Sequence, residues 1–281
     1  MPERIAERIL GRILERIPGR ILERIPGRNK VTNLPSQTDK KLGLLIDLDI
    51  CVGCHGCVTS CKEWNSTDDM LPLSDFDSYG DSPDGVFLNR VHGYEVNDGM
   101  TAQTVHFPRS CLHCEQPECV SVCPTGASYK RQEDGIVLVN PETCIGCKLC
   151  SWACPYGARE YDHNQGIMKK CTLCVDRIYN EELAEEDRKP ACVLACPTSA
   201  RLFGDFSDPH SEVSILSQER GGVALMESLD YKPVNRYLPP RKKQLSDRGE
   251  TTNEHYSSGS KIRSSDAVLD NFFSWLDKKL S

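Results

Sequence analysis

Short apolar runs separated by long polar stretches set the hydrophobic pattern of the chain. Residues 42–48 (LGLLIDL) and 135–139 (GIVLV) are apolar over the length of a strand, and each predicts a buried strand that leads into a group of cysteines. Residues 86–96 have a strand-like composition and lie within an insertion, residues 66–107, whose first part is rich in Asp, Gly and Pro. Residues 40–206 are therefore the organised part of the chain, and they contain every cysteine.

The two ends of the chain follow different patterns. Arginine and isoleucine each recur every four residues near the start, in a repeat of GRILERIP that prolines interrupt. We interpret residues 1–39 as a low-complexity basic arm, the alternative being an amphipathic membrane-surface segment. Residues 207–243 form a C-terminal extension, and the polar, Ser-rich residues 244–265 predict a flexible linker. Residues 266–281 predict an amphipathic helix that either docks on a partner or membrane or folds back.

Composition and charge narrow the class of protein. The chain has 281 residues, of which 38% are apolar, and no apolar run long enough to cross a bilayer, so we expect no membrane span of its own. The first thirty residues hold eight basic and four acidic side chains, which leaves 26 basic and 37 acidic side chains, a net charge of −11, in the rest. Such an acidic body argues against nucleic acid as a partner, because that binding rests on neutralising phosphates. The start of the chain shows no apolar export signal, which predicts a cytoplasmic location.

The 16 cysteines fall into four groups of four. The first and third groups have the spacing C-x2-C-x2-C-x3-C, while the middle gap widens to four residues in the second group and to seventeen in the fourth. A proline follows the second, third and fourth groups. Three closely spaced thiolates wrap one cuboidal cluster, and the fourth cysteine, ahead of a proline, binds the other cluster of a pair. The groups are Cys51, Cys54, Cys57 and Cys61; Cys111, Cys114, Cys119 and Cys123; Cys144, Cys147, Cys150 and Cys154; and Cys171, Cys174, Cys192 and Cys196.

Four such groups predict four [4Fe–4S] clusters arranged as two pairs. The expected fold is accordingly α+β, with two bacterial ferredoxin-like modules, loop insertions and flexible termini. Structural zinc also uses C-x2-C pairs but has no reason to repeat a C-x3-C-P ending, and disulfides suit small secreted domains. A zinc-binding scaffold without a redox role stays the alternative that metal analysis would test.

Residues near the cysteine groups are candidates for tuning the clusters. Two tryptophans are expected to shield a cluster from water, namely Trp64 and Trp152. Five basic residues are expected to compensate the negative charge of the clusters, namely Lys62, Arg159, Lys169, Lys170 and Arg177. His55 and His113 either bond to cluster sulfur or are partly exposed loop residues. No pattern for substrate chemistry or nucleotide binding is visible, so we expect a subunit that carries electrons and is no enzyme by itself.

The cysteine motifs resemble those of a known family. CVGCHGCVTSCKEWN, CLHCEQPECVSVCPTGA, CIGCKLCSWACPYGA, and KKCTLCVDR with CVLACPTSA are similar to the iron–sulfur electron-transfer (B) subunits of the complex iron–sulfur molybdoenzymes, the dimethyl sulfoxide reductase family. The resemblance covers about residues 40–206. The CKEWN ending of the first group and GVFLNRVHGYEV in the insertion look most like the subunit of the quinone-linked sulfite dehydrogenase.

The resemblance implies crossed ligand sets, each taking three cysteines from one group and the fourth from another. Cys119 stands where some nitrate reductase subunits have a tryptophan and a [3Fe–4S] cluster, which favours [4Fe–4S] here. The implied sets are set A, Cys51, Cys54, Cys57 and Cys196; set B, Cys61, Cys171, Cys174 and Cys192; set C, Cys111, Cys114, Cys119 and Cys154; and set D, Cys123, Cys144, Cys147 and Cys150.

The resemblance also implies a function and partners. The chain would relay electrons between a large molybdopterin catalytic subunit and an integral membrane quinone-reacting subunit, in the oxidation of sulfite to sulfate with quinone as acceptor. It would be cytoplasmic and peripheral to the inner membrane, held there by its partners. The alternatives are the same role in a dimethyl sulfoxide, polysulfide or tetrathionate reductase complex, or a free polyferredoxin. The ligands do not determine the direction of electron flow, because surrounding residues set cluster potentials.

Overall fold

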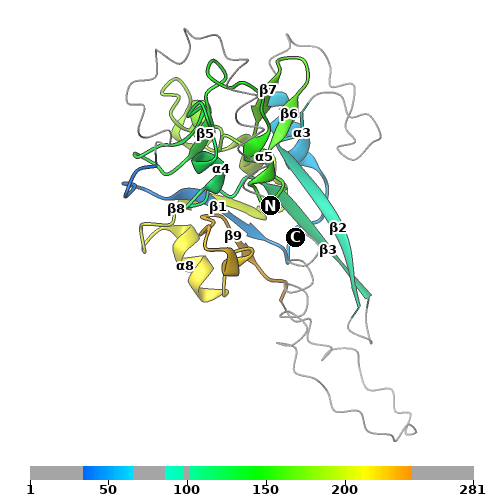
Figure 1. The fold of residues 1–281 in the computed structure, drawn as a ribbon. Helices are drawn as coiled ribbons and strands as arrows, with labels where there is room; N and C mark the ends of the chain where they lie inside the picture. Colours follow the sequence, from blue (N-terminus) through cyan, green and yellow to red (C-terminus); the bar gives the residue numbers. More distant parts are fainter. Residues whose placement is uncertain (1–33, 66–85, 98–101, 242–281) are drawn as a thin grey trace, which may run out of the picture.

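The computed structural model describes residues 34–65, 86–97 and 102–241 (Figure 1). The predicted linker, the predicted C-terminal helix, most of the basic arm and the first part of the insertion lie outside these residues. Within them, no helix is long and apolar enough to cross a membrane.

A three-stranded sheet joins the beginning and end of the described chain. Its central strand β1 (Leu42–Asp47) pairs antiparallel with β8 (Arg201–Asp205) and parallel with β9 (Arg236–Leu238). This confirms the strand predicted over residues 42–48, and its apolar run is buried because both of its edges and faces are covered. Figure 1 shows β9 beside β1, so the described part of the C-terminal extension completes the sheet.

A long antiparallel hairpin forms the second part of the core. Its strands are β2 (Asn89–Asn97) and β3 (Ala102–Ser110), and it reaches away from the sheet in Figure 1. The strand predicted over residues 86–96 is confirmed as β2, which starts three residues later. Its partner β3 was not predicted. The hairpin is joined to the sheet where the buried ring of Phe107 stacks on Tyr237 with 4.6 Å between ring centroids.

Short helices carry the third cysteine of each group. They are α3 (Gly56–Asn65), α4 (Glu118–Ser121), α5 (Leu149–Trp152) and α7 (Ala191–Leu194). Helix α3 packs against α7, and α4 packs against α5. The first and fourth cysteine groups are therefore neighbours, and so are the second and third.

Small elements connect these helices. The strand predicted over residues 135–139 is confirmed in its second part, as β5. The remaining elements are the hairpin β4 (Ser128–Lys130) with β5 (Val137–Val139), the hairpin β6 (Glu160–Asp162) with β7 (Ile167–Lys169), helices α6 (Val175–Ile178) and α8 (Glu212–Glu219), and the 3-10 turns η1 (Glu185–Asp187) and η2 (Glu227–Leu229). This mixture of short helices and small sheets agrees with an α+β fold.

Candidate metal centres

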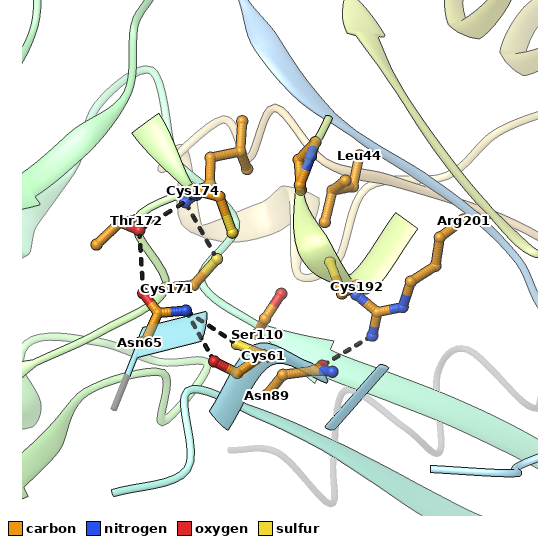
Figure 2. Close-up of a pocket in the computed structure, with 12 residues that line it drawn as sticks. Leu44, Cys61, Asn65, Asn89, Ser110, Cys171, Thr172, Cys174, Cys192 and Arg201 are labelled. Carbon is orange, nitrogen blue, oxygen red and sulfur yellow. Dashed lines mark hydrogen bonds between the residues drawn. The ribbon is translucent and has the colours of Figure 1, made fainter. Parts of the chain in front are cut away.

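The four cysteines of set B line one buried cavity. Cys61 comes from α3, Cys171 and Cys174 from the loop before α6, and Cys192 from α7. Figure 2 shows these four side chains converging from separate elements on one cavity. Each of the four residues is at most 9% exposed, so this is the most enclosed of the sets.

The four cysteines of set D line a second cavity. Cys123 follows α4, and the other three members belong to the third group, from Cys144 to Cys150. Burial, with smaller contributions from the thiolates of Cys123 and Cys147, raises the pKa of Cys150 to about 11, although the positive charge of Arg159 opposes the increase. Two members of this set, Cys144 and Cys147, are partly exposed.

The electrostatic neighbours of individual thiols identify the other two groupings. Burial raises the pKa of Cys114, and the thiolates of Cys111, Cys119 and Cys154, the other members of set C, raise it further. Burial likewise raises the pKa of Cys51, and in set A the contributing thiolates are those of Cys57 and Cys196. Cys54, the remaining member of set A, is exposed. These neighbours agree with the implied groupings for sets B, C and D and for three members of set A, and the full ligand sets stay a prediction.

The four sets follow one another in a series. The thiolate of Cys57 in set A adds to the raised pKa of Cys192 in set B, behind the larger effect of burial. Burial raises the pKa of Cys171 in set B to about 12, with a contribution from Cys111 in set C. Cys119 in set C does the same for Cys150 in set D. These contributions place the sets in the order A, B, C, D, with an exposed thiol in A, buried thiols in B, and partly exposed thiols in both C and D.

A repeated backbone turn shapes the four C-x2-C loops. The residue before the second cysteine has a left-handed conformation in every group, with φ of +66° at Gly53, +47° at His113, +66° at Gly146 and +57° at Leu173. Backbone amides beside such turns point into the loop and make concave anion sites. Further amides reach the thiols from nearby strands and turns, with the nitrogens of Ser128 and Ala200 3.3 and 3.2 Å from the sulfurs of Cys123 and Cys196.

The donor sets fit iron–sulfur clusters. All sixteen cysteines are free thiols, and burial raises the pKa of several, Cys61 among them, so that a buried thiolate needs a bound cation to form. In the described ranges, no three His, Cys, Asp or Glu side chains converge closely enough to hold a single metal ion. The cysteines of sets B and D instead line cavities, and a cluster of several iron and sulfide ions suits such a site better than one ion does.

Two buried arginines also suit a bound iron–sulfur cluster. Arg159 lies at the cavity of set D and Arg201 at the cavity of set B. Arg159 Nη1, Arg201 Nε and Arg201 Nη1 are buried and have no hydrogen-bond acceptor among the described residues. Buried cationic N–H groups are costly without acceptors, and cluster sulfides and thiolates would supply them.

The basic residues expected to compensate cluster charge divide into two kinds. Arg159 is buried, and its Nη2 lies 2.8 Å from Cys119 Sγ. Lys170 is buried and donates to the carbonyl oxygens of Val137 and Cys171. The other three contact different partners: Lys62 lies over the Phe87 ring, Lys169 pairs with Asp162, and Arg177 stacks on Trp64.

Two basic residues at the thiols were missed in the sequence. Arg201 is 2% exposed, and its charge lowers the pKa of Cys192 against the larger opposite effect of burial. Lys130 is buried and donates to the Cys114 carbonyl oxygen at 2.8 Å, and burial lowers its pKa to about 8. The signal for Arg201 was present, because CPTSAR repeats the CPYGAR sequence that contains Arg159.

The predictions for aromatic side chains are partly wrong. Trp152 is 79% exposed on the outer side of the four-residue helix α5, so it does not shield a cluster from water. Trp64 is 37% exposed, and its Nε1 donates to Asp176. His113 is fully buried rather than partly exposed, and its Nδ1 accepts a hydrogen bond from the backbone N–H of Val137.

Comparisons with known proteins agree with this site. Residues 102–206 match a 4Fe-4S dicluster domain family and residues 48–64 a 4Fe-4S binding domain family. The chain is 62% identical to the B subunit of sulfite dehydrogenase from Allochromatium vinosum, over 73% of this chain and 85% of that protein. It is 39% identical to the B subunit of tetrathionate reductase from Salmonella typhimurium, over 71% and 70% of the two proteins. It is 37% identical to the B subunit of polysulfide reductase from Wolinella succinogenes, over 73% and 96%.

Proposed function

Since this protein belongs to the family of 4Fe–4S iron–sulfur B subunits that includes those of sulfite dehydrogenase and of tetrathionate and polysulfide reductases, we propose that it relays electrons through four [4Fe–4S] clusters. Each cysteine set holds one cluster, and each cluster takes up and passes on one electron at a time. The chain itself offers no substrate chemistry and acts as a subunit of an oxidoreductase complex.

The gathering of cysteines from four separate stretches of chain into neighbouring sets is the observation that carries this proposal. The buried set B and set D each line a cavity, and Cys54 of set A is exposed. A relay needs centres that lie next to one another and at least one end that a partner can approach. We assign sets A and B, joined by α3 and α7, to one ferredoxin-like module, and sets C and D, joined by α4 and α5, to the other.

The partners and substrate follow from the relatives. The 62% identity to the B subunit of a sulfite dehydrogenase supports sulfite as the electron source. Sulfite and water would give sulfate, two protons and two electrons at a molybdopterin catalytic subunit, and quinone would take the two electrons and two protons at a membrane subunit. The complex would lie on the cytoplasmic side of the inner membrane, with this chain attached to the membrane through its partners.

Purification of the intact complex tests the proposal. We expect about sixteen irons and as many sulfides per chain, stoichiometric molybdenum, and sulfite-dependent quinone reduction. A Cys61→Ser variant, which removes a ligand of set B in the middle of the series, should lower turnover at least about tenfold, while Thr59→Ala on the same helix should not. Iron with no molybdenum-containing partner would instead favour a free polyferredoxin, and zinc in place of iron would overturn the redox role.

The substrate assay separates sulfite from the second candidate. Identities of 39% and 37% to tetrathionate and polysulfide reductase subunits favour the same relay in a reductase as the alternative. Tetrathionate, polysulfide and dimethyl sulfoxide should therefore be offered to the reduced complex. Turnover with one of them, and none with sulfite, would assign the chain to the reductase.

A further inference from the structure

Two buried arginines occupy equivalent positions in the sequence repeat. Arg159 follows Cys154 by five residues in CPYGAR, and Arg201 follows Cys196 by five residues in CPTSAR. The residues are 5% and 2% exposed. Each guanidinium keeps its charge in a protein interior, because arginine does not lose its proton at any ordinary pH. A fixed positive charge thus follows the last cysteine of the third group and the last cysteine of the fourth group at the same spacing.

The Arg159 guanidinium lies between sets C and D. Its Nη2 donates to Cys119 Sγ of set C and to Ser128 Oγ, both at 2.8 Å. The same side chain lines the cavity of set D. Although burial opposes the charge, the thiolates of Cys119, Cys150 and Cys111 hold the pKa of Arg159 above its usual value, and these residues belong to both sets.

The Arg201 guanidinium lies at set B, and its charge also interacts with Cys57 of set A. It lines the cavity of set B, and its Nη2 donates to Asn89 Oδ1 at 2.7 Å (Figure 2). Against the opposing effect of burial, the thiolates of Cys192, Cys57 and Cys61 raise its pKa, and they also belong to both sets. Asn89 thus stands to Arg201 as Ser128 stands to Arg159: a neutral side chain that orients the guanidinium.

The buried N–H groups left over point to the occupant of the cavities. Arg159 Nη1, Arg201 Nε and Arg201 Nη1 have no acceptor among the residues that the structure describes. Lys170 and Lys130, two other buried cations near set C, differ because their Nζ atoms donate to carbonyl oxygens, those of Val137 and Cys171 for Lys170 and those of Cys114 and Glu115 for Lys130. The two arginines, unlike these lysines, therefore have N–H groups that remain available to cluster sulfur.

We propose that Arg159 and Arg201 set the reduction potentials of the clusters, each acting on the clusters of the two sets with which its charge interacts. This inference rests on the proposed electron relay. When a cluster accepts one electron from its neighbour, the neighbour is oxidised and the accepting cluster gains one negative charge without a proton. A guanidinium at hydrogen-bonding distance favours that reduced form and so raises the potential. It also screens the repulsion between electrons on the two clusters of a pair.

Redox titration of the intact complex, followed by electron paramagnetic resonance, tests the inference. We expect Arg159→Gln to lower the equilibrium constant for reduction of a cluster in sets C or D at least tenfold, which is about 59 mV for one electron. Arg201→Gln should do the same for different signals, those of sets A or B. The matched control is Arg131→Gln, because Arg131 pairs with Asp134 and lies over the Tyr179 ring instead of contacting a thiol. It should leave every potential unchanged.

The lysine variants separate charge from structure. Arg159→Lys and Arg201→Lys keep the charge and lose the forked hydrogen bonds, so their shifts should be smaller than those of the glutamine variants but still measurable. Unchanged potentials in variants with full iron content would overturn the inference, as would equal shifts for lysine and glutamine. If the glutamine variants lose iron, the lysine variants take their place, and unchanged potentials in lysine variants with full iron content would overturn the inference. A wild-type complex without iron would instead reject the proposed function.

Discussion

Substitution of Gly146 by alanine tests whether the left-handed turn in a C-x2-C loop is required for cluster binding. Gly146 has φ of +66°, and a Cβ there would overlap the backbone carbonyl oxygen of Gly166 in the turn between β6 and β7. The conformation alone costs an alanine about 1–2 kcal/mol. The overlap adds to this cost because the opposing atom belongs to the backbone and cannot rotate away. The loop or the hairpin must therefore shift, and Cys144 and Cys147 flank the residue that shifts.

Gly166 provides the matched control. Its φ is +68°, but the nearest atom to a Cβ is the Tyr161 hydroxyl oxygen, at 3.9 Å. Gly166→Ala therefore carries the conformational cost, about 1–2 kcal/mol, without the overlap. We expect it to keep all its iron and to lose only that much stability.

Iron counting and spectroscopy distinguish the two variants. Gly146→Ala should lose about a quarter of the iron, because set D is one of four sets. The electron paramagnetic resonance spectrum should lack the signal of one cluster only. Its free energy of unfolding should fall further than that of Gly166→Ala. Equal iron content and equal stability in the two variants would show that the close approach of the two backbones does not matter, and would refute the argument.

Three further changes test other parts of the structure. Phe107→Ala removes a fully buried ring that stacks on Tyr237 and should lower the free energy of unfolding by about 3–5 kcal/mol in chemical denaturation, whereas Ile215→Ala on the exposed side of α8 should have a much smaller effect. Trp152→Ala should change that free energy by no more than about 0.5 kcal/mol and leave the cluster signals unaltered, because the side chain is exposed; a loss of cluster signal would restore a shielding role. Burial, with Arg109 and Arg90, lowers the pKa of His92 to about 4. Between about pH 6.5 and pH 4, His92 therefore binds a proton in the unfolded state but not in the folded state, and the free energy of unfolding should fall as the pH falls through this window. His92→Gln should flatten this part of the denaturation profile, and an unchanged slope would contradict the assigned pKa.

The cysteine spacing could be interpreted from the sequence because its information is local. Three ligands within seven residues wrap one cluster through a short loop, so Cys144, Cys147 and Cys150 needed no knowledge of the rest of the chain. Crossed partners such as Cys61 and Cys192 are far apart in sequence, and only the family resemblance gave them. The apolar run of β1 was equally local, whereas its neighbour β9 is a three-residue strand with no pattern of its own.

The errors arose where a side chain's environment depends on distant segments. Strand β3 contains Pro108 and polar residues, and it becomes a strand because nine register pairs with β2 hold it. Trp152 lies between two ligand cysteines in the sequence, yet a four-residue helix turns it outward while Cys150 faces inward. Arg201 lies far from Cys61 and Cys57 along the chain, and the pairing of β8 with β1 brings it close enough for their thiolates to raise its pKa.

One loop position separates the inner clusters from the outer ones. The left-handed residue before the second cysteine is glycine in sets A and D, at Gly53 and Gly146, but His113 in set C and Leu173 in set B. A side chain in that conformation costs about 1–3 kcal/mol, which glycine avoids. His113 and Leu173 are 0% and 1% exposed, and full burial of a leucine is worth about 1.5–3 kcal/mol, enough to offset the strain. The strained backbone at His113 and Leu173 thus places large buried side chains where water would otherwise approach the clusters of sets B and C. We therefore expect Leu173→Gly to leave the backbone turn intact while admitting water to set B, which would appear as a shifted potential for one cluster and unchanged iron content.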